Sequence, residues 1–510
     1  MHQQQANSTA PYRGRPREHS SSFIKPARAD MKARETALRS ALLQAQLDLG
    51  KRDYPMIIVI GGLPGAGKSE LVHRLNEWLD PRFVDTSAQW RHSDEEEDRP
   101  YFWRFWRHMP RKGRTTIFLG SWYTRLLHDS AAGKLTAPEQ RERLATIQRF
   151  EHMLHNDGTL LVKLWLHVDR DTQQKRLAAD RIRLQHLPAA AAQWAEDPAA
   201  AQGAADQVLA ESSSATAPWH LITAADPRQR DLDAGATLLR MMTERAAVAR
   251  GGNGATSTPY PPPAHATTTP ALALAAVPSD LRLSKSTYRR SLVEQQQRLQ
   301  ALAWRAHEAQ RSLVAVFEGW DAAGKGSAIR RVTAAMDPRL YRVVQSSAPS
   351  DEERAQHYLW RYWRALERRG RTMLFDRSWY GRVLVERVEG FASTEEWQRA
   401  YEEINDFEAQ IAGHGGVLLK FWLHISPEEQ LHRFRQRETT PHKQHKITED
   451  DWRNRERWED YERAVLDMLA LTSTPNAPWI LVAANDKRYA RVQILRALCD
   501  RLEQALGTQP

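Results

Sequence analysis

The clearest candidate for chemistry in this 510-residue chain is a glycine-rich stretch, GWDAAGKGS, at residues 319–327. Its pattern is close to G-x-x-x-x-G-K-[ST], in which backbone N–H groups and a helix N-terminus surround phosphate oxygens and the lysine adds a positive charge. Gly326 stands where a Mg²⁺-binding hydroxyl is usual, and Asp321 lies inside the loop. Phosphate repels a carboxylate unless a divalent cation lies between them, so we interpret Asp321 as a metal ligand. A glycine-rich turn that only closes a strand–helix connection is the alternative.

A second carboxylate is expected at the end of a neighbouring strand, because phosphoryl transfer needs a metal held against the loop and an acceptor oriented in line. The segment TMLFDRSWYGR supplies one: Asp376 ends an apolar strand pattern, and Arg377 follows directly. We expect Asp376 to be the second metal ligand, with a guanidinium close to the mouth of the loop. A helix N-cap is the alternative role for this aspartate.

The chain contains an internal repeat. A second loop, GGLPGAGKS, begins its pattern at Gly62, and an offset of 257 residues (319 minus 62) carries it onto the loop at Gly319. The same offset superimposes the DPR, DEE and SWY motifs of the two halves, and carries the segment at 163–167 onto the segment at 420–424. More than 100 residues of the two copies align in this way without a gap, and such an alignment does not arise by chance.

The first copy keeps the loop pattern but not the proposed metal ligands. Four residues define its loop: Gly62, Gly67, Lys68 and Ser69. Three residues replace the carboxylates and the arginine of the second copy: Pro64 for Asp321, Leu119 for Asp376 and Gly120 for Arg377. We therefore interpret the first loop as degenerate, in a phosphate-loop fold that no longer catalyses and has a structural role.

Strand patterns alternate with helical ones in each copy, which predicts an α/β fold with a parallel sheet and helices on both faces. The expected strands are Met56–Ile60, Thr115–Leu119, Leu160–His167 and Trp219–Thr223 in the first copy, and Leu313–Phe317, Thr372–Phe375, Val417–Ile425 and Trp479–Ala483 in the second. Helices are expected to open at Lys68 and Lys325, and a charged helix precedes each copy, at 31–49 and 285–310.

Two polar stretches divide the chain. Residues 1–30 are expected to form a disordered tail, and 250–279, rich in Gly, Pro, Thr and Ala, a disordered linker. The first domain is therefore expected at 31–249 and the second, catalytic domain at 280–510.

Composition limits the class of protein. Cys499 is the one cysteine, so no internal disulfide forms and a reducing, cytoplasmic setting is the simplest expectation. Apolar runs are shorter than the roughly 20 residues of a membrane span, so no membrane partner is expected. The formal charge of +10 indicates an anionic partner. Nucleic acid is not expected, because no recognised nucleic-acid module is present and the loop and strand carboxylates would have no purpose there.

Several motifs in order resemble the polyphosphate kinase 2 family: EGWDAAGKG, DRSWYGRVLVERV, LLKFWLHIS, ITEDDWRNRERWEDYERA and APWILVAANDKRYAR. The similarity is close over 280–505 and weaker over 31–245, as in the fused two-domain form of the family. The resemblance implies tandem domains with a thymidylate-kinase-like phosphate-loop fold and a helical lid over the active site. It also implies Mg²⁺ as cofactor, and inorganic polyphosphate and a nucleotide as partners.

The resemblance also assigns site residues. The expected catalytic residues are Asp321, Lys325, Asp376, Arg377 and Glu386, the last serving metal or acceptor. The expected phosphate-binding residues are Gly319, Ala323, Gly324, Gly326 and Ser327 in the loop and Arg433 and Arg437 in the lid, where basic side chains neutralise the transferring phosphates. The first copy has Arg176 at the position of Arg433 but Asp180 at that of Arg437, which again argues against activity there.

Three functions stay open at this stage. The first is Mg²⁺-dependent transfer of a phosphoryl group from polyphosphate to AMP, forming ADP, in the second domain. The second is a kinase of the same fold that uses ATP, or polyphosphate with ADP, GMP or GDP. The third is a polyphosphate- or nucleic-acid-binding protein without turnover, which the intact carboxylates, lysine and arginine of the second copy argue against. Acceptor preference, net direction, chain-length preference and oligomeric state, including a homo-oligomer, are not determined by the sequence.

Overall fold

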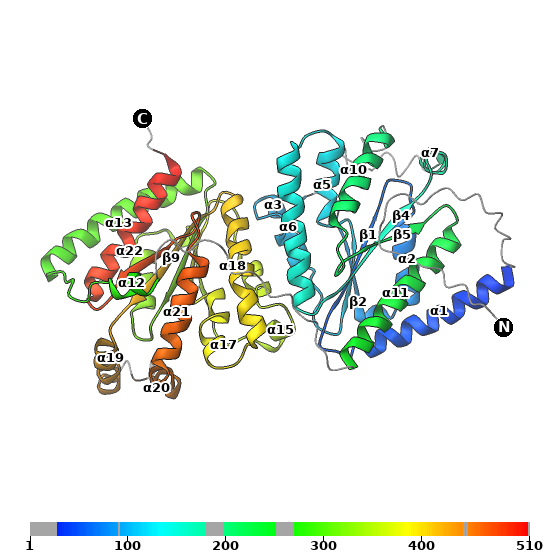
Figure 1. Cartoon of the computed structure of the whole chain (residues 1–510). Coiled ribbons are helices and arrows are strands. Elements are labelled where there is room, and N and C mark those ends of the chain that lie inside the picture. Colours follow the sequence, from blue (N-terminus) through cyan, green and yellow to red (C-terminus); the bar gives the residue numbers. More distant parts are fainter. Residues whose placement is uncertain are drawn as a thin grey trace. The chain divides into compact units, whose positions relative to one another are not determined.

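The computed structural model describes residues 28–89, 92–179, 197–250, 270–441, 444 and 447–507. The chain divides into two compact units, each built around one sheet (Figure 1). Unit 1 comprises Met1–His92, Arg104–Ser257 and Ala355–His357, and unit 2 comprises Ser93–Trp103, Thr258–Arg354 and Tyr358–Pro510. The tandem arrangement is the expected one, although each unit also takes a short segment from the other half of the chain.

The sheet of unit 1 has five described strands, all parallel, in the order β2-β3-β1-β4-β5. They are β1 Met56–Gly62, β2 Val84–Ala88, β3 Thr115–Leu119, β4 Leu160–His167 and β5 Trp219–Thr223. The helices α1 Arg28–Leu49, α2 Lys68–Trp78 and α11 Pro227–Arg250 lie on one face, and α5 Tyr123–Ala131, α6 Ala137–Asn156 and α10 Pro198–Ser212 on the other (Figure 1). Shorter elements are η1 Pro81–Phe83, α3 Asp94–Glu97, α4 Trp103–Trp106 and α7 Arg170–Ala179.

Unit 2 repeats this plan with the strand order β10-β9-β6-β8-β7. Its strands are β6 Leu313–Gly319, β7 Tyr341–Gln345, β8 Thr372–Asp376, β9 Val417–His424 and β10 Trp479–Ala483. Its longer helices are α13 Lys285–Glu308, α14 Lys325–Thr333, α18 Thr394–Gly413, α19 Pro427–Thr439, α20 Glu449–Glu456, α21 Trp458–Thr472 and α22 Lys487–Leu506. Shorter elements are α12 Pro270–Ala275, η2 Pro338–Leu340, α15 Asp351–Arg354, α16 Trp360–Ala365, η3 Trp379–Arg382 and α17 Val385–Val388.

These elements confirm the predicted α/β class and the four strands predicted in each copy. The edge strands β2 and β7 were not predicted, because most of their residues are at least partly exposed and they lack the apolar run of an interior strand. Two boundaries also differ from expectation: α1 begins at Arg28, inside the stretch expected to be a tail, and α12 forms inside the stretch expected to be a linker. Among the described residues, no helix has both the length and the apolar character needed to cross a bilayer.

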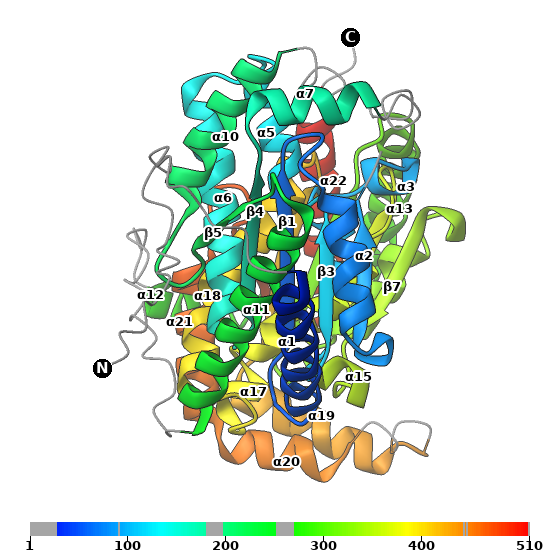
Figure 2. The same ribbon diagram turned by 90° about the vertical axis from the view of Figure 1, so that its right-hand side faces the viewer.

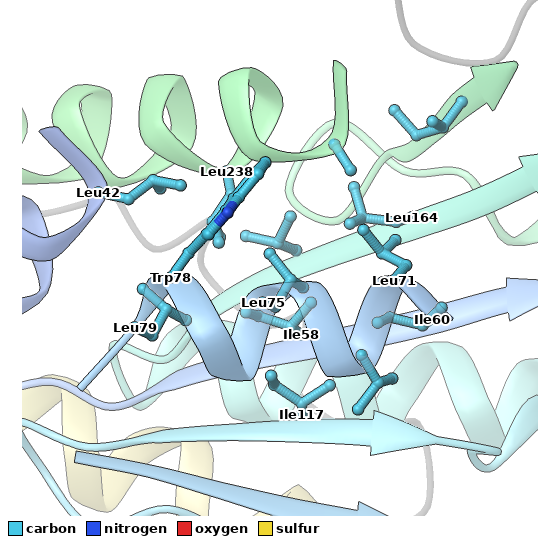
Figure 3. Close-up of a cluster of buried hydrophobic side chains, with 14 of the residues drawn as sticks. Leu42, Ile58, Ile60, Leu71, Leu75, Trp78, Leu79, Ile117, Leu164 and Leu238 are labelled. Atoms are coloured by element: carbon cyan, nitrogen blue, oxygen red, sulfur yellow. The ribbon is translucent and has the colours of Figure 1, made fainter. Parts of the chain in front are cut away.

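The core of unit 1 shows why the central strands read as continuous apolar runs. Ile58 and Ile60 of β1 point to one face, where they are buried against Leu71 and Leu75 of α2 (Figure 3). Ile57 is equally buried on the opposite face. A parallel strand covered on both sides must be apolar at every position, because neither face meets water. In the view of Figure 2, α1, α2 and α11 lie in front of the strands of unit 1.

A buried ion pair accounts for part of the repeated sequence. In unit 2, Lys420 of β9 donates to Glu408 at 2.8 Å and to the Tyr380 hydroxyl at 2.9 Å, and both charged side chains are inaccessible to water. The corresponding lysine of unit 1, Lys163 of β4, donates to Glu151 at 2.7 Å. Removing either partner of such a pair leaves an uncompensated buried charge, so both copies must keep it whether or not they catalyse.

Candidate active site

The phosphate loop of unit 2 joins β6 to α14. Its first glycine, Gly319, has φ +148°, and a Cβ there would lie 2.5 Å from the Leu423 carbonyl oxygen, so only glycine fits. Gly324 caps α14 with φ +114°. Lys325 then turns back, and its Nζ donates to the carbonyl of Gly319 at 2.6 Å and of Trp320 at 3.3 Å. These contacts confirm a phosphate-loop conformation, with its lysine held against the loop.

Asp321 lies at the mouth of this loop with its side chain 15% exposed. One carboxylate oxygen accepts from Arg377 Nη2 at 2.9 Å, and the other accepts from Asn454 Nδ2 at 3.0 Å. Burial by itself raises the pKa of Asp321, but the charges of Lys325 and Arg377 outweigh it, so that the pKa lies below its usual value. The group is therefore ionised, which is what metal coordination requires of a carboxylate.

Asp376 lies next to the loop position at which a hydroxyl is usual. It ends β8, opposite Phe317 of β6, and a Cβ on Gly326 would lie 3.4 Å from its Oδ2. Gly326 and Asp376 are thus neighbours, and the absence of a side chain at one leaves room for the carboxylate of the other. Unit 1 has the reverse combination in sequence, a serine in its loop and an apolar residue at the end of β3.

Two backbone positions in unit 2 are strained where unit 1 has glycine. Arg377 has φ +60° and Ala322 has φ +64°, a region that costs a residue with a Cβ about 1–2 kcal/mol. The corresponding residues of unit 1, Gly120 at φ +82° and Gly65 at φ +80°, adopt the same conformation without that cost. Strain of this kind clusters at functional sites, and at Arg377 it accompanies the bond that holds the guanidinium on Asp321.

The sequence reasoning missed a third carboxylate, Glu318. It is the residue before Gly319, it is buried, and its Oε1 accepts from the Ser378 hydroxyl at 2.8 Å. Burial raises its pKa, and the charges of Lys325 and Arg377 oppose this. The available signal was the comparison of the two copies, since the corresponding residue of unit 1 is Gly61, where a Cβ would collide with Trp165 at 2.5 Å.

Four of the five predicted catalytic residues lie together in the structure, and the fifth, Glu386, has other partners. Lys325, Asp321, Asp376 and Arg377 influence one another electrostatically and form one cluster. Glu386, on α17, pairs with Arg382 at 3.2 Å, and no hydrogen bond or ion pair among the described residues joins it to this cluster. Burial raises the pKa of Glu386, and Arg382 opposes this. Burial raises the pKa of Tyr362, and the charges of Glu386 and Glu318 raise it further, so both glutamates act on this tyrosine.

The two predicted lid arginines have different surroundings. Arg433 of α19 is 3% exposed, and its five N–H groups donate to Glu429 and to the carbonyls of Ala322, Ala323, Ala484 and Asn485. Arg176 of unit 1 makes the corresponding bonds to Gly65, Ala224 and Ala225. Arg437 is 23% exposed and lies 3.9 Å from Asp451 of α20. The predicted difference at Asp180 falls outside the described residues.

The predicted lid is formed in unit 2 by α20 and the beginning of α21. Trp458 stacks on Trp320 of the phosphate loop, with ring centroids 3.7 Å apart and an interplanar angle of 12°. Asn454 reaches Asp321, as described above, and Arg453 pairs with Glu389 at 2.9 Å. The helical lid is therefore seated on the loop, on the side where Asp321 lies.

The loop of unit 1 has the same backbone shape as that of unit 2, and side chains of unit 1 pack against it. Lys68 donates to the carbonyls of Gly62 at 2.7 Å and Leu63 at 2.9 Å, as its counterpart does in unit 2. A Cβ on Gly67 would lie 2.2 Å from Nη1 of Arg230, a buried side chain paired with Asp231 at 2.7 Å. A buried ion pair thus packs on the glycine that caps this loop.

The protein side chains of the site supply only part of the ligand shell of a divalent metal ion. No cluster of three or more His, Cys, Asp or Glu ligands occurs in the described parts of the chain. Mg²⁺ in phosphoryl-transfer sites typically takes one or two carboxylates and completes its shell with waters and substrate phosphates. Asp321, within the phosphate loop, and Asp376, beside Gly326 of that loop, are a donor set of that kind.

The parallel sheet, the glycine-rich loop and the carboxylates at its mouth together define the class of phosphate-loop proteins that handle phosphoryl groups. The sequence model described as "Polyphosphate kinase 2 (PPK2)" matches residues 25–249 and again 282–510. The chain therefore belongs to the polyphosphate kinase 2 family, with two family domains in tandem, as the motifs predicted.

Individual relatives agree with this assignment. The chain is 45% identical over 472 residues to the polyphosphate:AMP phosphotransferase of Pseudomonas aeruginosa, covering 92% of this chain and 95% of that one. It is 41% identical over 229 residues to the ADP-polyphosphate phosphotransferase of the same organism, covering 45% of this chain and 75% of that one. The crystal structure of a polyphosphate kinase 2 from Pseudomonas aeruginosa superimposes with a TM-score of 0.83 at 43% identity, over 94% and 96% of the two chains.

Proposed function

We propose that this protein transfers a phosphoryl group from inorganic polyphosphate to AMP, forming ADP, and that unit 2 performs the reaction. The observation that carries the proposal is the cluster at the loop of unit 2, where Asp321 and Asp376 lie beside a phosphate loop with Arg377 held in a strained conformation. Family membership supports polyphosphate as the donor. The relative matched over nearly the whole chain is named for AMP, whereas the one matched over less than half is named for ADP.

The residues of unit 2 have distinct roles in this proposal. Loop N–H groups at the start of α14 and the Lys325 ammonium bind the donor phosphate. Arg377, 51% exposed and fixed by Asp321, directs its remaining N–H groups toward the transferring phosphoryl group. Asp321 and Asp376 would hold Mg²⁺, which when bound neutralises charge between the carboxylates and the phosphate oxygens. The lid excludes water, so that the phosphoryl group passes to the nucleotide.

Unit 1 is proposed to be non-catalytic. It lacks counterparts of Asp321, Asp376, Arg377 and Glu318, and its loop glycine Gly67 is covered by a buried arginine. The relaxed glycines at its two left-handed positions support the same conclusion, because strain is absent where no side chain has to be placed. We further propose a cytoplasmic location, since nucleotides and polyphosphate are substrates of that compartment and the chain has one cysteine.

The test is a product assay on the purified chain with Mg²⁺, polyphosphate and AMP, ADP, GMP or GDP in turn, with nucleotides separated chromatographically. ADP from AMP, lost on addition of EDTA and independent of ATP, is the expected result. Asp321→Asn and Asp376→Asn should each reduce turnover by about 10²-fold or more while leaving the fold intact. Turnover with ATP but not with polyphosphate would overturn the proposal, and normal rates in both variants would remove the metal role.

A further inference from the structure

Asn454 is the one lid side chain among the described contacts that hydrogen-bonds directly to the side chain of a proposed metal ligand. Its Nδ2 donates to Oδ2 of Asp321 at 3.0 Å, across 133 residues of sequence. Its Oδ1 accepts from the Tyr461 hydroxyl of α21 at 3.0 Å. Because an ionised carboxylate only accepts, the amide must face it with nitrogen, and the hydroxyl on the other side favours the same orientation.

The carboxylate of Asp321 is therefore fixed from two sides. Arg377, from the end of β8, holds Oδ1 at 2.9 Å, and the lid holds Oδ2. A carboxylate has about four lone-pair sites, so that one donor on each oxygen leaves positions free for a cation. Hydrogen bonds of this kind orient metal ligands elsewhere, and removing one typically costs about 10–100-fold in metal affinity.

Contacts on both sides of Asn454 set its position. On one side, Arg453 pairs with the largely buried Glu389 at 2.9 Å, and Arg457 lies 3.6 Å from the same carboxylate. On the other, Trp458 stacks on Trp320, the residue directly before Asp321. The lid thus contacts two adjacent loop residues, Trp320 and Asp321, and movement of α20 must change the hydrogen bonding of the carboxylate.

We infer that Asn454 is a positioning residue that couples the seating of the lid to the orientation of Asp321, so that the lid must be seated for the loop to hold its metal ion. The inference rests on the proposed metal role of Asp321. Coupling of this kind is reciprocal: the metal ion must stabilise the seated lid by the same factor by which the seated lid strengthens metal binding. The opposite arrangement, in which the bond to Asn454 must break before metal binds, predicts effects of opposite sign.

The first experiment measures hydrogen exchange of the backbone amides of α20 in the full chain, with no nucleotide or polyphosphate, with and without Mn²⁺. Asn454→Ala and Asp321→Ala should each speed exchange in α20 by about 10–100-fold, because each removes the same charge-assisted bond, and the double variant should add little. Mn²⁺ should slow exchange in the parent and have a much smaller effect in Asn454→Ala. Parental exchange in Asp321→Ala, or slower exchange with Mn²⁺ in Asn454→Ala than in the parent, overturns the inference.

The second experiment measures the Mn²⁺ dissociation constant from the decrease in the electron paramagnetic resonance signal of the free ion. Asn454→Ala is expected to weaken binding by about 10–100-fold, and Tyr461→Phe, which keeps the ring and loses the orienting hydroxyl, by a smaller factor in the same direction. Asn405→Ala is the matched control: its amide donates to the Leu471 carbonyl of α21 at 2.9 Å and makes no hydrogen bond to the loop among the described residues, so its loss should leave Mn²⁺ binding unchanged.

Failure of this inference is distinguishable from failure of the proposed function. If Asp321→Asn abolishes Mn²⁺ binding and Asn454→Ala leaves it unchanged or tighter, the coupling is wrong and the metal role stands. If Asp321→Asn leaves Mn²⁺ binding and ADP formation unchanged, the metal role itself is wrong, and the coupling falls with it.

Discussion

Replacing Arg433 by alanine is expected to destabilise unit 2 strongly, because this side chain ties the phosphate loop to the end of β10. Four of its five N–H groups donate to backbone carbonyls at 2.7–2.9 Å, two from the loop and two from the residues that follow β10. The fifth donates to Glu429 at 2.6 Å. The sequence predicts that Arg433 binds phosphate. In the structure, each of these five N–H groups is hydrogen-bonded to another part of the protein.

The size of the effect follows from burial. Removing one member of a buried, hydrogen-bonded network costs about 3–5 kcal/mol, because the remaining polar groups lose their partner. In a domain of 150–250 residues, 1 kcal/mol changes Tm by about 2–4 °C, so the expected decrease is about 6–20 °C. Arg433→Lys keeps the charge but loses the planar fork, and should still be destabilising.

Calorimetry and steady-state kinetics below the transition form the assay. Arg176→Ala is the matched control, since it removes the corresponding brace from unit 1 and should lower stability while leaving turnover within a few-fold of the parent. Arg437→Ala should do the reverse: it should leave Tm nearly unchanged and raise the KM for polyphosphate. This KM should rise less steeply with salt than that of the parent, because the variant has lost a partly exposed charge whose attraction salt screens. An Arg433→Ala protein with the parental Tm and a raised polyphosphate KM would refute the bracing role and restore the phosphate-binding one.

Three further predictions concern the asymmetry of the units and their response to acid. Lys325→Ala should abolish ADP formation and Lys68→Ala should leave it within a few-fold of the parent; equal inactivity in two folded variants would mean that unit 1 takes part in the reaction. Gly326→Ala should raise stability by about 0.5–1 kcal/mol, because alanine favours a helix, yet lower turnover by about tenfold, because the methyl group enters the space beside Asp376; parental turnover would show that this space is not used. Burial and then the charge of Arg240 lower the pKa of His220 to about 4, and both of its ring nitrogens lack a hydrogen-bond partner among the described residues. Since the unfolded histidine takes up a proton near pH 6.5, the contribution of His220 to the free energy of unfolding should be constant above that pH and fall by about 3 kcal/mol between pH 6.5 and 4. Urea unfolding at several pH values should therefore show a larger fall in the parent than in His220→Leu.

Local patterns in the sequence determined the fold class and the place of the chemistry. A phosphate loop is a contiguous motif, so Gly319, Gly324 and Lys325 could be recognised from spacing alone. Parallel strands end at a common edge, so an acidic residue at the end of the β8 pattern had to lie near that loop. The internal sequence repeat also indicated which copy lacks the carboxylates, because equivalent positions could be compared within one chain.

Tertiary structure alone decided which polar groups meet and which way they point. The bonds from Arg433 to the loop and from Asn454 to Asp321 join residues more than 100 positions apart, and no periodicity of helix or strand encodes such a pairing. The strain at Arg377 is likewise invisible in sequence, since the left-handed conformation is imposed by the surrounding structure and not by the residue type. The sequence thus determined where charged groups gather, whereas their burial and their partners decided which of them face a substrate and which hold the protein together.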